Sequence, residues 1–222
     1  LPARPRSHNE WILPGGGSLV FRHMQREADK YSYQGAQIPF IGFDELTHFS
    51  WGQFTYMLSR NRSMTGVKPK MRGTCNPSPD HWLRSFLAWW IDEEGDPIPE
   101  RAGVLRWMGM VGGETHWADT KAEIVEQFGA EVEPLSVTFV PSVLEDNPKL
   151  TEKDPAYRAR LKALPAHERA QLLAGNWNAR PVVGSYFNRR WFHMVDAAPA
   201  GTRWVRYWDR ASTEPSQTNP DP

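Results

Sequence analysis

The chain has 222 residues and a formal net charge of zero, with 26 basic and 26 acidic side chains. A dedicated nucleic-acid module is usually basic, so the overall charge does not indicate one, although segregated charge would still allow DNA binding. The single cysteine, Cys75, excludes an internal disulfide, and the longest strongly apolar run, 86–91, is too short to cross a bilayer. Eleven tryptophans predict a well-packed core or a contact surface.

The first two predicted strands cover residues 18–22 and 38–43. The first follows a glycine-rich turn at 14–17. The second is a short apolar run that ends abruptly in two acids, Asp44 and Glu45, which is typical of a buried parallel strand. The two acids are therefore expected at the carboxyl end of a strand inside a sheet.

Two helices and a third strand are predicted to follow. Ser50 and Gln53 have the spacing of a capping box, which places the start of a helix directly after Ser50. A strand is expected over 70–75, and a second helix is expected to start at 78–80. The order of these elements predicts an α/β fold with a central, mostly parallel sheet and helices packed on it. The second helix is expected to bury an aromatic stripe of Trp82, Phe86 and Trp89.

The second half of the chain is predicted to be more irregular. Its strands are expected to continue the sheet in the antiparallel sense, and its last two helices are expected to form a small subdomain or hinge. In chain order the predicted elements are a polar loop at 92–101, strands at 104–108 and 135–140 with a helix at 123–128 between them, helices at 154–164 and 165–175, a turn at 184–187 and a strand at 202–208.

Asp44 and Glu45 are the sharpest candidates for chemistry. A buried parallel strand delivers its last residues to the ligand crevice of an open α/β sheet. There the first acid can hold the hydrated Mg²⁺ that bridges nucleotide phosphates, and the second can polarise an attacking water. The alternative is that the two acids only stabilise the start of the next helix.

Thr74 and Asn76 lie at the end of the next predicted strand. A polar group in this position would face the same nucleotide from the neighbouring strand. The alternative is a simple turn at Asn76 and Pro77. The occurrence of two polar strand ends with a capped helix between them favours the nucleotide interpretation.

Eight short motifs occur in order along the chain. They are Tyr-Gln-Gly at 33–35, Ile-Gly-Phe-Asp-Glu at 41–45, Leu-Ser-Arg at 58–60, Gly-Thr-Cys-Asn-Pro at 73–77, Asp-Asn-Pro-Lys-Leu at 146–150, Leu-Ala-Gly-Asn-Trp at 173–177, Gly-Ser-Tyr-Phe at 184–187 and Tyr-Trp-Asp-Arg-Ala at 207–211. None is specific alone. The ordered set, from about residue 16 to the end, resembles the large terminase subunit family of tailed bacteriophages and prophages.

The resemblance implies a DNA-packaging motor with a nuclease. Asp44 would be the Walker B ligand of Mg²⁺, and Glu45 would be the catalytic carboxylate for ATP hydrolysis. Thr74 and Asn76 would belong to the motif that couples hydrolysis to DNA movement. Asp209 would be the first metal-binding acid of an RNase H-like nuclease that cuts concatemeric DNA with two Mg²⁺ or Mn²⁺ ions.

The resemblance also implies domains and partners. Residues 1–142 would be the second part of a P-loop (ASCE-type) ATPase domain, 143–200 a helical linker or lid subdomain, and 201–222 the start of the nuclease. The partners would be double-stranded DNA, the portal protein, the small terminase subunit and further copies of the chain in a ring on the procapsid. The setting would be the cytoplasm of the bacterial host, with no membrane. Candidates for an arginine that reaches nucleotide charge are Arg22, Arg26 and Arg60, which the sequence does not rank; the alternative for each, which the sequence favours, is an ordinary surface arginine.

Two parts of this machinery do not occur in the sequence. No G-x-x-x-x-G-K-[ST] pattern exists, and the glycines at 14–17 lack a lysine and precede a strand. A single carboxylate, Asp209, cannot hold two metal ions. We therefore expect the phosphate-binding loop upstream of Leu1 and the other nuclease acids beyond Pro222. We expect the 222-residue chain by itself to be inactive as an ATPase and as a nuclease.

Two other interpretations stay open. The tryptophan-rich surface and the helix pair could form a non-catalytic module that docks on a portal, a small subunit or duplex DNA. The chain could also be the remnant of a decayed prophage gene. The histidines and Cys75 are weaker candidates for functional residues. The seven histidines lack metal-ligand spacing. Cys75 has no obvious base partner and is expected to be a small buried residue.

Overall fold

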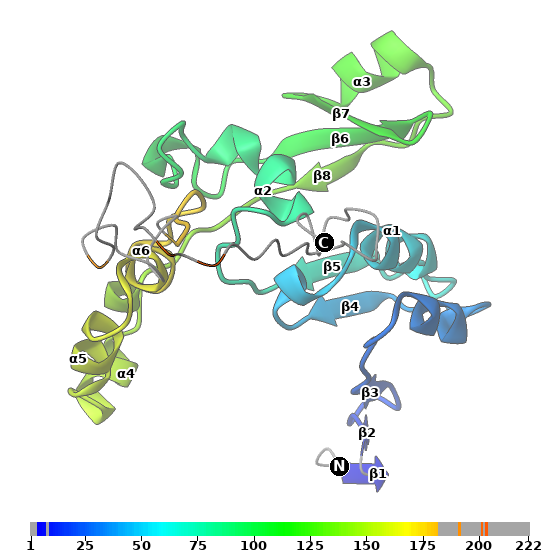
Figure 1. The fold of residues 1–222 in the computed structure, drawn as a ribbon. Coiled ribbons are helices and arrows are strands. Elements are labelled where there is room, and N and C mark those ends of the chain that lie inside the picture. The colour runs from blue at the N-terminus through cyan, green and yellow to red at the C-terminus, as the bar shows by residue number, and fades with distance from the viewer. Residues whose placement is uncertain (1–3, 8, 182–190, 192–200, 202, 204–222) are drawn as a thin grey trace. The chain divides into compact units, whose positions relative to one another are not determined.

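The computed structural model describes residues 4–7, 9–181, 191, 201 and 203 (Figure 1). The chain divides into two compact units, one up to Asn76 and one from Pro77 onward. Helices and small sheets alternate along the described chain, so the predicted α/β class is confirmed at this level. Within the described residues, no helix combines the length and the apolar character that a membrane span requires.

The first unit opens with a three-stranded antiparallel sheet of β1 (Arg4–Ser7), β2 (Glu10–Ile12) and β3 (Ser18–Val20). The turn between β2 and β3 is closed by the N–H of Leu13, which donates to the carbonyl of Gly17 at 2.7 Å. The glycine-rich segment 14–17 therefore forms a hairpin turn, in agreement with its place before a predicted strand.

A pair of parallel strands forms the second part of this unit (Figure 1). β4 (Phe40–Phe43) and β5 (Lys70–Gly73) lie in register along their whole length. The helix α1 (Trp51–Arg60) connects them, which gives the predicted order of strand, helix and strand. Two 3₁₀ helices, η1 (Glu27–Tyr33) and η2 (Leu46–His48), flank β4 in the chain.

The helix α1 starts at the predicted capping box. Ser50 Oγ accepts a hydrogen bond from the N–H of Gln53 at 3.0 Å, and Gln53 Oε1 accepts one from the N–H of Ser50 at 3.0 Å. The Gln53 side chain is only 4% exposed, and its Nε2 also donates to the carbonyl of Arg26 at 3.1 Å. The cap therefore fixes the helix to the segment that precedes η1.

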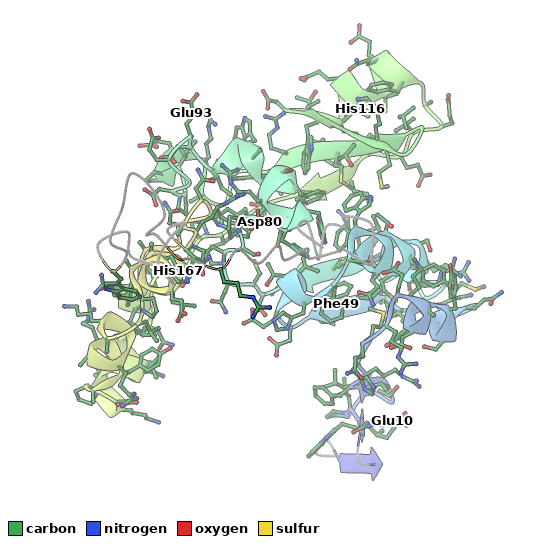
Figure 2. All side chains as sticks on the ribbon, in the orientation of Figure 1. Glu10, Phe49, Asp80, Glu93, His116 and His167 are labelled. Carbon is green, nitrogen blue, oxygen red and sulfur yellow. The ribbon has the colours of Figure 1, made fainter. Side chains whose placement is uncertain are left out.

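The strand β4 is buried on one face. Ile41 and Phe43 are 7% and 6% exposed. The ring of Phe43 packs edge-on against Phe49, at 4.9 Å between centroids, and near Phe54 of α1. Phe49 is labelled in Figure 2. Phe40, on the other face, is 52% exposed. The parallel pairing is confirmed, but burial of β4 is one-sided, and the described parallel sheet has two strands.

The second unit has its own antiparallel sheet, in the order β7–β6–β8. Its strands are β6 (Arg106–Val111), β7 (Glu114–Ala118) and β8 (Leu135–Val137). The sheet shares no strand pairing with β4 or β5, so the expectation that 104–108 and 135–140 continue the parallel sheet is wrong. The reason is local: β6 pairs with both of its neighbours inside this unit, which uses both of its edges.

The strand β7 is absent from the predicted elements. The overlooked signal is Gly112-Gly113, two consecutive glycines with φ of 60° and 86°. A two-residue turn with positive φ at both positions matches the twist of a hairpin, and glycine adopts it without strain. The helix α3 (Lys121–Phe128) follows β7, starts two residues before the helix predicted over 123–128, and buries Ile124, which is 1% exposed.

The predicted aromatic helix is shorter and rotated. The helix α2 (Trp82–Phe86) starts after His81, so 78–80 does not begin it. A 3₁₀ helix, η3 (Ala88–Trp90), follows, and its three residues per turn replace the spacing of the α-helix. Trp89 therefore does not continue the helical spacing of Trp82 and Phe86. All three are only half-buried, and the stripe predicted for them is wrong. The buried residues of this segment are Leu83, Leu87 and Trp90, at 3%, 5% and 1% exposure.

Tryptophan contributes to the core of the second unit. Trp90 donates from Nε1 to the carbonyl of Val104 at 3.1 Å and packs edge-on against Trp117 at 5.7 Å. A buried indole needs such a partner for its N–H, and here it has one. Of the two predicted roles for the tryptophans, a packed core is confirmed for Trp90.

Short helices complete the described chain. They are η4 (Pro99–Arg101), η5 (Leu144–Asp146), α4 (Pro148–Lys153), α5 (Tyr157–Lys162) and α6 (Ala166–Ala174). The helix α6 begins after Pro165 and ends at Gly175, as predicted, and Gly175 has a φ of 70°. The predicted turn at 184–187 and strand at 202–208 lie outside the described residues, and so does Asp209.

Candidate functional site

The carboxyl ends of β4 and β5 lie side by side. Because the two strands are parallel and in register, Phe43 pairs with Gly73. The residue that follows each strand therefore leaves the sheet at the same edge. These next residues are Asp44 and Thr74. Thr74 Oγ1 donates a hydrogen bond to Asp44 Oδ1 at 2.9 Å. The structure therefore brings together two of the predicted site residues.

Glu45 and Asn76 form a second pair at this edge. Asn76 Nδ2 donates to Glu45 Oε1 at 2.9 Å, and the N–H of Asn76 donates to Glu45 Oε2 at 3.3 Å. The N–H of Glu45 donates in turn to Thr74 Oγ1 at 3.2 Å. Each acid after β4 is thus held by a polar residue after β5. We call these four residues, Asp44, Glu45, Thr74 and Asn76, the acid edge.

The backbone of Glu45 is left-handed, with φ 54° and ψ 65°. Within the described residues it is the only non-glycine residue with a positive φ. This conformation costs about 1–2 kcal/mol for a residue with a Cβ, and it persists where the surroundings hold it. Here the bonds from Asn76 and to Thr74 hold it. The conformation turns the chain sharply between β4 and η2 and brings the Glu45 carboxylate against the end of β5.

The acid edge lies at the surface, and buried apolar residues pack beneath it. Asp44, Thr74 and Asn76 are exposed, and Glu45 is half-buried. Beneath them, Leu46 is 7% exposed and packs against Gly73, where an added Cβ would lie 2.9 Å from Leu46 Cδ2. The carboxylates are therefore open to a ligand while their backbone is fixed from below.

Cys75 lies between the two polar residues of β5's end and is half-buried. Burial and, to a smaller extent, the negative charge of Glu45 raise the pKa of its thiol to about 11. The thiol is therefore neutral at physiological pH and a poor nucleophile. Cys75 was expected to be a small buried residue, and the structure shows it only half-buried.

The donor set of the acid edge fits a hydrated Mg²⁺. This ion keeps several of its waters and binds proteins through one or two carboxylates, with phosphate oxygens as further ligands. Asp44 offers an exposed carboxylate with a hydroxyl beside it. Among the described residues, no cluster of three or more His, Cys, Asp or Glu could enclose a metal.

The candidate arginines have other contacts in the described structure. Arg60 is the last residue of α1. The guanidinium of Arg60 lies over the ring of Tyr56, at 5.2 Å, and that of Arg22 lies over Tyr33, at 6.0 Å. Arg26 precedes η1, where its N–H donates to Asp29. A role of any of the three at nucleotide charge stays a prediction.

The second unit contains a polar assembly that the sequence analysis missed. The N–H of Trp177 donates to the carbonyl of Gly95 at 2.7 Å, and Asn178 Nδ2 donates to the carbonyl of Glu93 at 2.8 Å. Asn176 Nδ2 donates to Asp96 Oδ1 at 2.8 Å. These bonds join the turn at 92–96 to the segment at 176–178. We call this assembly the Trp177 clasp.

The Trp177 clasp is tightly packed. Trp177 is 2% exposed, and its ring packs edge-on near Phe139. Gly95 has a φ of 96°, and an added Cβ would lie 2.6 Å from the backbone N of Asn178. Only glycine combines this conformation with this approach. The sequence offered Gly95 in a polar loop as the one local signal, without any indication of its partner.

The fold and the acid edge define a class: an α/β protein whose acids gather at the carboxyl edge of parallel strands. The family model described as "Terminase large subunit, T4likevirus-type, N-terminal" matches residues 2–194. The chain therefore belongs to the terminase large subunit family, which gives it a role in viral DNA packaging and confirms the resemblance found in the sequence. No curated protein and no solved structure matches the chain.

Proposed function

We propose that the acid edge is the Walker B and coupling region of the packaging ATPase, and that hydrolysis of ATP there drives viral DNA into the procapsid. The observation that carries the proposal is the cross-strand pairing of Asp44 with Thr74 and of Glu45 with Asn76. Simple acids at the start of a helix would not require partners on the next strand.

Asp44 and Glu45 take different roles in this proposal. Asp44, exposed and next to a hydroxyl, holds the hydrated Mg²⁺ of Mg·ATP, an ion that neutralises charge on the phosphates when it is bound. Glu45 orients the attacking water and accepts its hydrogen bond at a carboxylate oxygen. The half-buried position and fixed backbone of Glu45 limit the directions in which its carboxylate points.

Asn76 acts on Glu45 as a positioning residue. It donates to both carboxylate oxygens, through its side chain and its backbone. Each carboxylate oxygen has more than one acceptor site, so Glu45 can hold Asn76 and a water at the same time. Loss of the Asn76 amide would leave the carboxylate free to rotate away from the water.

The same hydrogen bonds give a physical route for coupling. Any change in the position of either acid alters a bond to Thr74 or Asn76, and these residues lead directly out of β5. We propose that the chain after β5 transmits hydrolysis to the DNA in this way. The nuclease role of Asp209 with Mg²⁺ or Mn²⁺, and the ring of copies that works with portal and small subunit, belong to the same proposal.

The test uses the complete packaging ATPase with Glu45→Gln, which keeps the size of the side chain and removes its charge. We expect ATP turnover to fall at least about 100-fold, while Mg·ATP binding stays within about threefold. Glu126→Gln, on the exposed side of α3, is the matched control and should turn over normally. Turnover within about threefold of the parent in Glu45→Gln would remove Glu45 from the proposed role.

A further inference from the structure

Positive charge is concentrated in one segment of this neutral chain. Residues 46–79 contain no aspartate and no glutamate, and their five basic residues all fall between residues 60 and 72. Because the whole chain is neutral, this segment carries a net charge of +5 and the remainder −5. We call residues 60–72 the basic segment. Its cations are Arg60, Arg62, Lys68, Lys70 and Arg72.

The cations of the basic segment have no acidic partners in the described structure. All except Arg60 are exposed, and Arg60 lies over the ring of Tyr56. Elsewhere in the described chain, basic residues do pair with acids, as Arg106 does with Asp119 at 3.1 Å. Among the described residues, no carboxylate forms an ion pair with the basic segment. Its charge is therefore available to a ligand.

One residue fixes the basic segment to the sheet. Asn61 Nδ2 lies 2.9 Å from the carbonyl of Ile38 and 3.1 Å from the carbonyl of Lys70. The N–H of Ile38 donates to the carbonyl of Arg60 at 3.0 Å. Both ends of the loop between α1 and β5 are thereby attached to the amino ends of the two strands. The loop that carries Arg62 and Lys68 projects from this anchor.

The loop of the basic segment, which carries Arg62 and Lys68, and the acid edge lie at opposite ends of the parallel strands. The acids follow the last residues of β4 and β5, whereas Asn61 binds at their first residues. Four residues of strand span about 13 Å. A change of charge in the loop therefore leaves the acid edge intact, and the two regions can be tested separately.

We propose that the basic segment contacts the phosphate backbone of double-stranded DNA. The argument is charge complementarity: four exposed cations on the loop after α1 and on β5, with no acid among them, are the electrostatic footprint of a polyphosphate surface. The choice of duplex DNA rests on the packaging role of the family. Such contacts are independent of base sequence and suit a protein that moves along DNA.

The test measures duplex affinity of the 222-residue chain over a range of salt, about 0.05 to 0.3 M. The slope of log K against log salt is negative, and each lost phosphate contact reduces its magnitude by about 0.9. For the double variant Arg62→Gln, Lys68→Gln we expect a slope that is smaller in magnitude by about 1.8, so its affinity depends less on salt. The matched control is Lys121→Gln, Lys149→Gln, which removes two exposed cations from α3 and α4. Its slope should equal that of the parent.

Equal slopes for the two double variants, or no salt-dependent binding of duplex by the parent chain, would overturn this proposal. Tighter binding of polyglutamate than of duplex would reassign the segment to an acidic protein partner and overturn it as well. None of these results bears on ATP turnover at Glu45, which is measured separately. A failure of the basic segment is thus distinguishable from a failure of the proposed ATPase.

Discussion

The acid edge and the Trp177 clasp are both held by polar contacts between segments that are distant in the chain, but they differ in burial. At the acid edge the polar side chains reach the surface, and only the residues beneath them are buried. In the clasp, Trp177 itself is 2% exposed and binds the backbone of Gly95. The comparison teaches that similar polar contacts leave side chains open to solvent at the edge, as the proposed site requires, whereas in the clasp they surround a buried residue of the second unit.

Truncation of the clasp's indole should have the largest effect on folding. Removal of a buried aromatic side chain costs about 3–5 kcal/mol, because contacts are lost and a cavity remains. We expect Trp177→Ala to lower the free energy of unfolding by this amount, measured by urea denaturation. Trp191 is 71% exposed, so Trp191→Ala is the control and should change the free energy by less than about 0.5 kcal/mol. Similar losses in both variants would contradict the buried clasp.

An added methyl group at Gly95 should be the next most damaging change. Gly95→Ala combines an unfavourable φ with a contact of 2.6 Å to backbone that cannot move aside easily. We expect a loss of about 2–4 kcal/mol. Gly103 has a similar φ, 74°, and open space around it, so Gly103→Ala measures the conformational cost alone, about 1 kcal/mol. If the two variants are equally stable, the close approach of Asn178 to Gly95 is wrong.

The free energy of unfolding should depend on pH through the raised pKa of the Cys75 thiol. Its pKa is raised to about 11 in the folded protein, so the unfolded chain loses the thiol proton first as pH increases. Stability from this residue is fully present below the ordinary thiol pKa and is lost as pH rises from about 9 to 11. Because the thiol is partly exposed, we expect about 1–2 kcal/mol. Urea denaturation at both ends of this window should show a smaller drop for Cys75→Ala than for the parent.

The smallest effect on folding is expected at the acid edge. Asn76 is exposed and its hydrogen bonds to Glu45 compete with water, so Asn76→Ala should cost less than about 1 kcal/mol. ATP turnover of the complete enzyme should nevertheless fall, with Mg·ATP binding retained. Asn61→Ala provides a contrast, since Asn61 anchors both strands and should affect folding more than turnover. A loss of stability in Asn76→Ala as large as in Trp177→Ala would erase the distinction between the two regions.

The sequence predicted the acid edge because its determinants are local. Apolar runs with polar ends marked β4 and β5, and Ser50 with Gln53 marked the helix between them. Parallel pairing of consecutive strands then brings Asp44 next to Thr74 without further information. The left-handed backbone of Glu45 was not predictable, because bonds to the neighbouring strand, rather than the residue's own preference, maintain it.

The Trp177 clasp was not predictable for the opposite reason. Its two segments are about 80 residues apart, as the bond from Asn176 to Asp96 shows, and neither has a regular apolar period. The stripe of α2 was mispredicted because the chain changes from an α-helix to a 3₁₀ turn after Phe86, which breaks the helical spacing. Local pattern thus identified the elements, and contacts between distant segments decided what each one buries.

The central claim is that the acid edge binds and hydrolyses Mg·ATP, and Asp44 tests it most directly. Calorimetric titration of the complete ATPase with ATP, in the presence and absence of Mg²⁺, measures how much affinity the ion contributes. We expect Asp44→Asn to remove most of the gain from Mg²⁺, at least about tenfold, and to leave metal-free binding unchanged. An unchanged Mg²⁺ dependence in Asp44→Asn would contradict the claim.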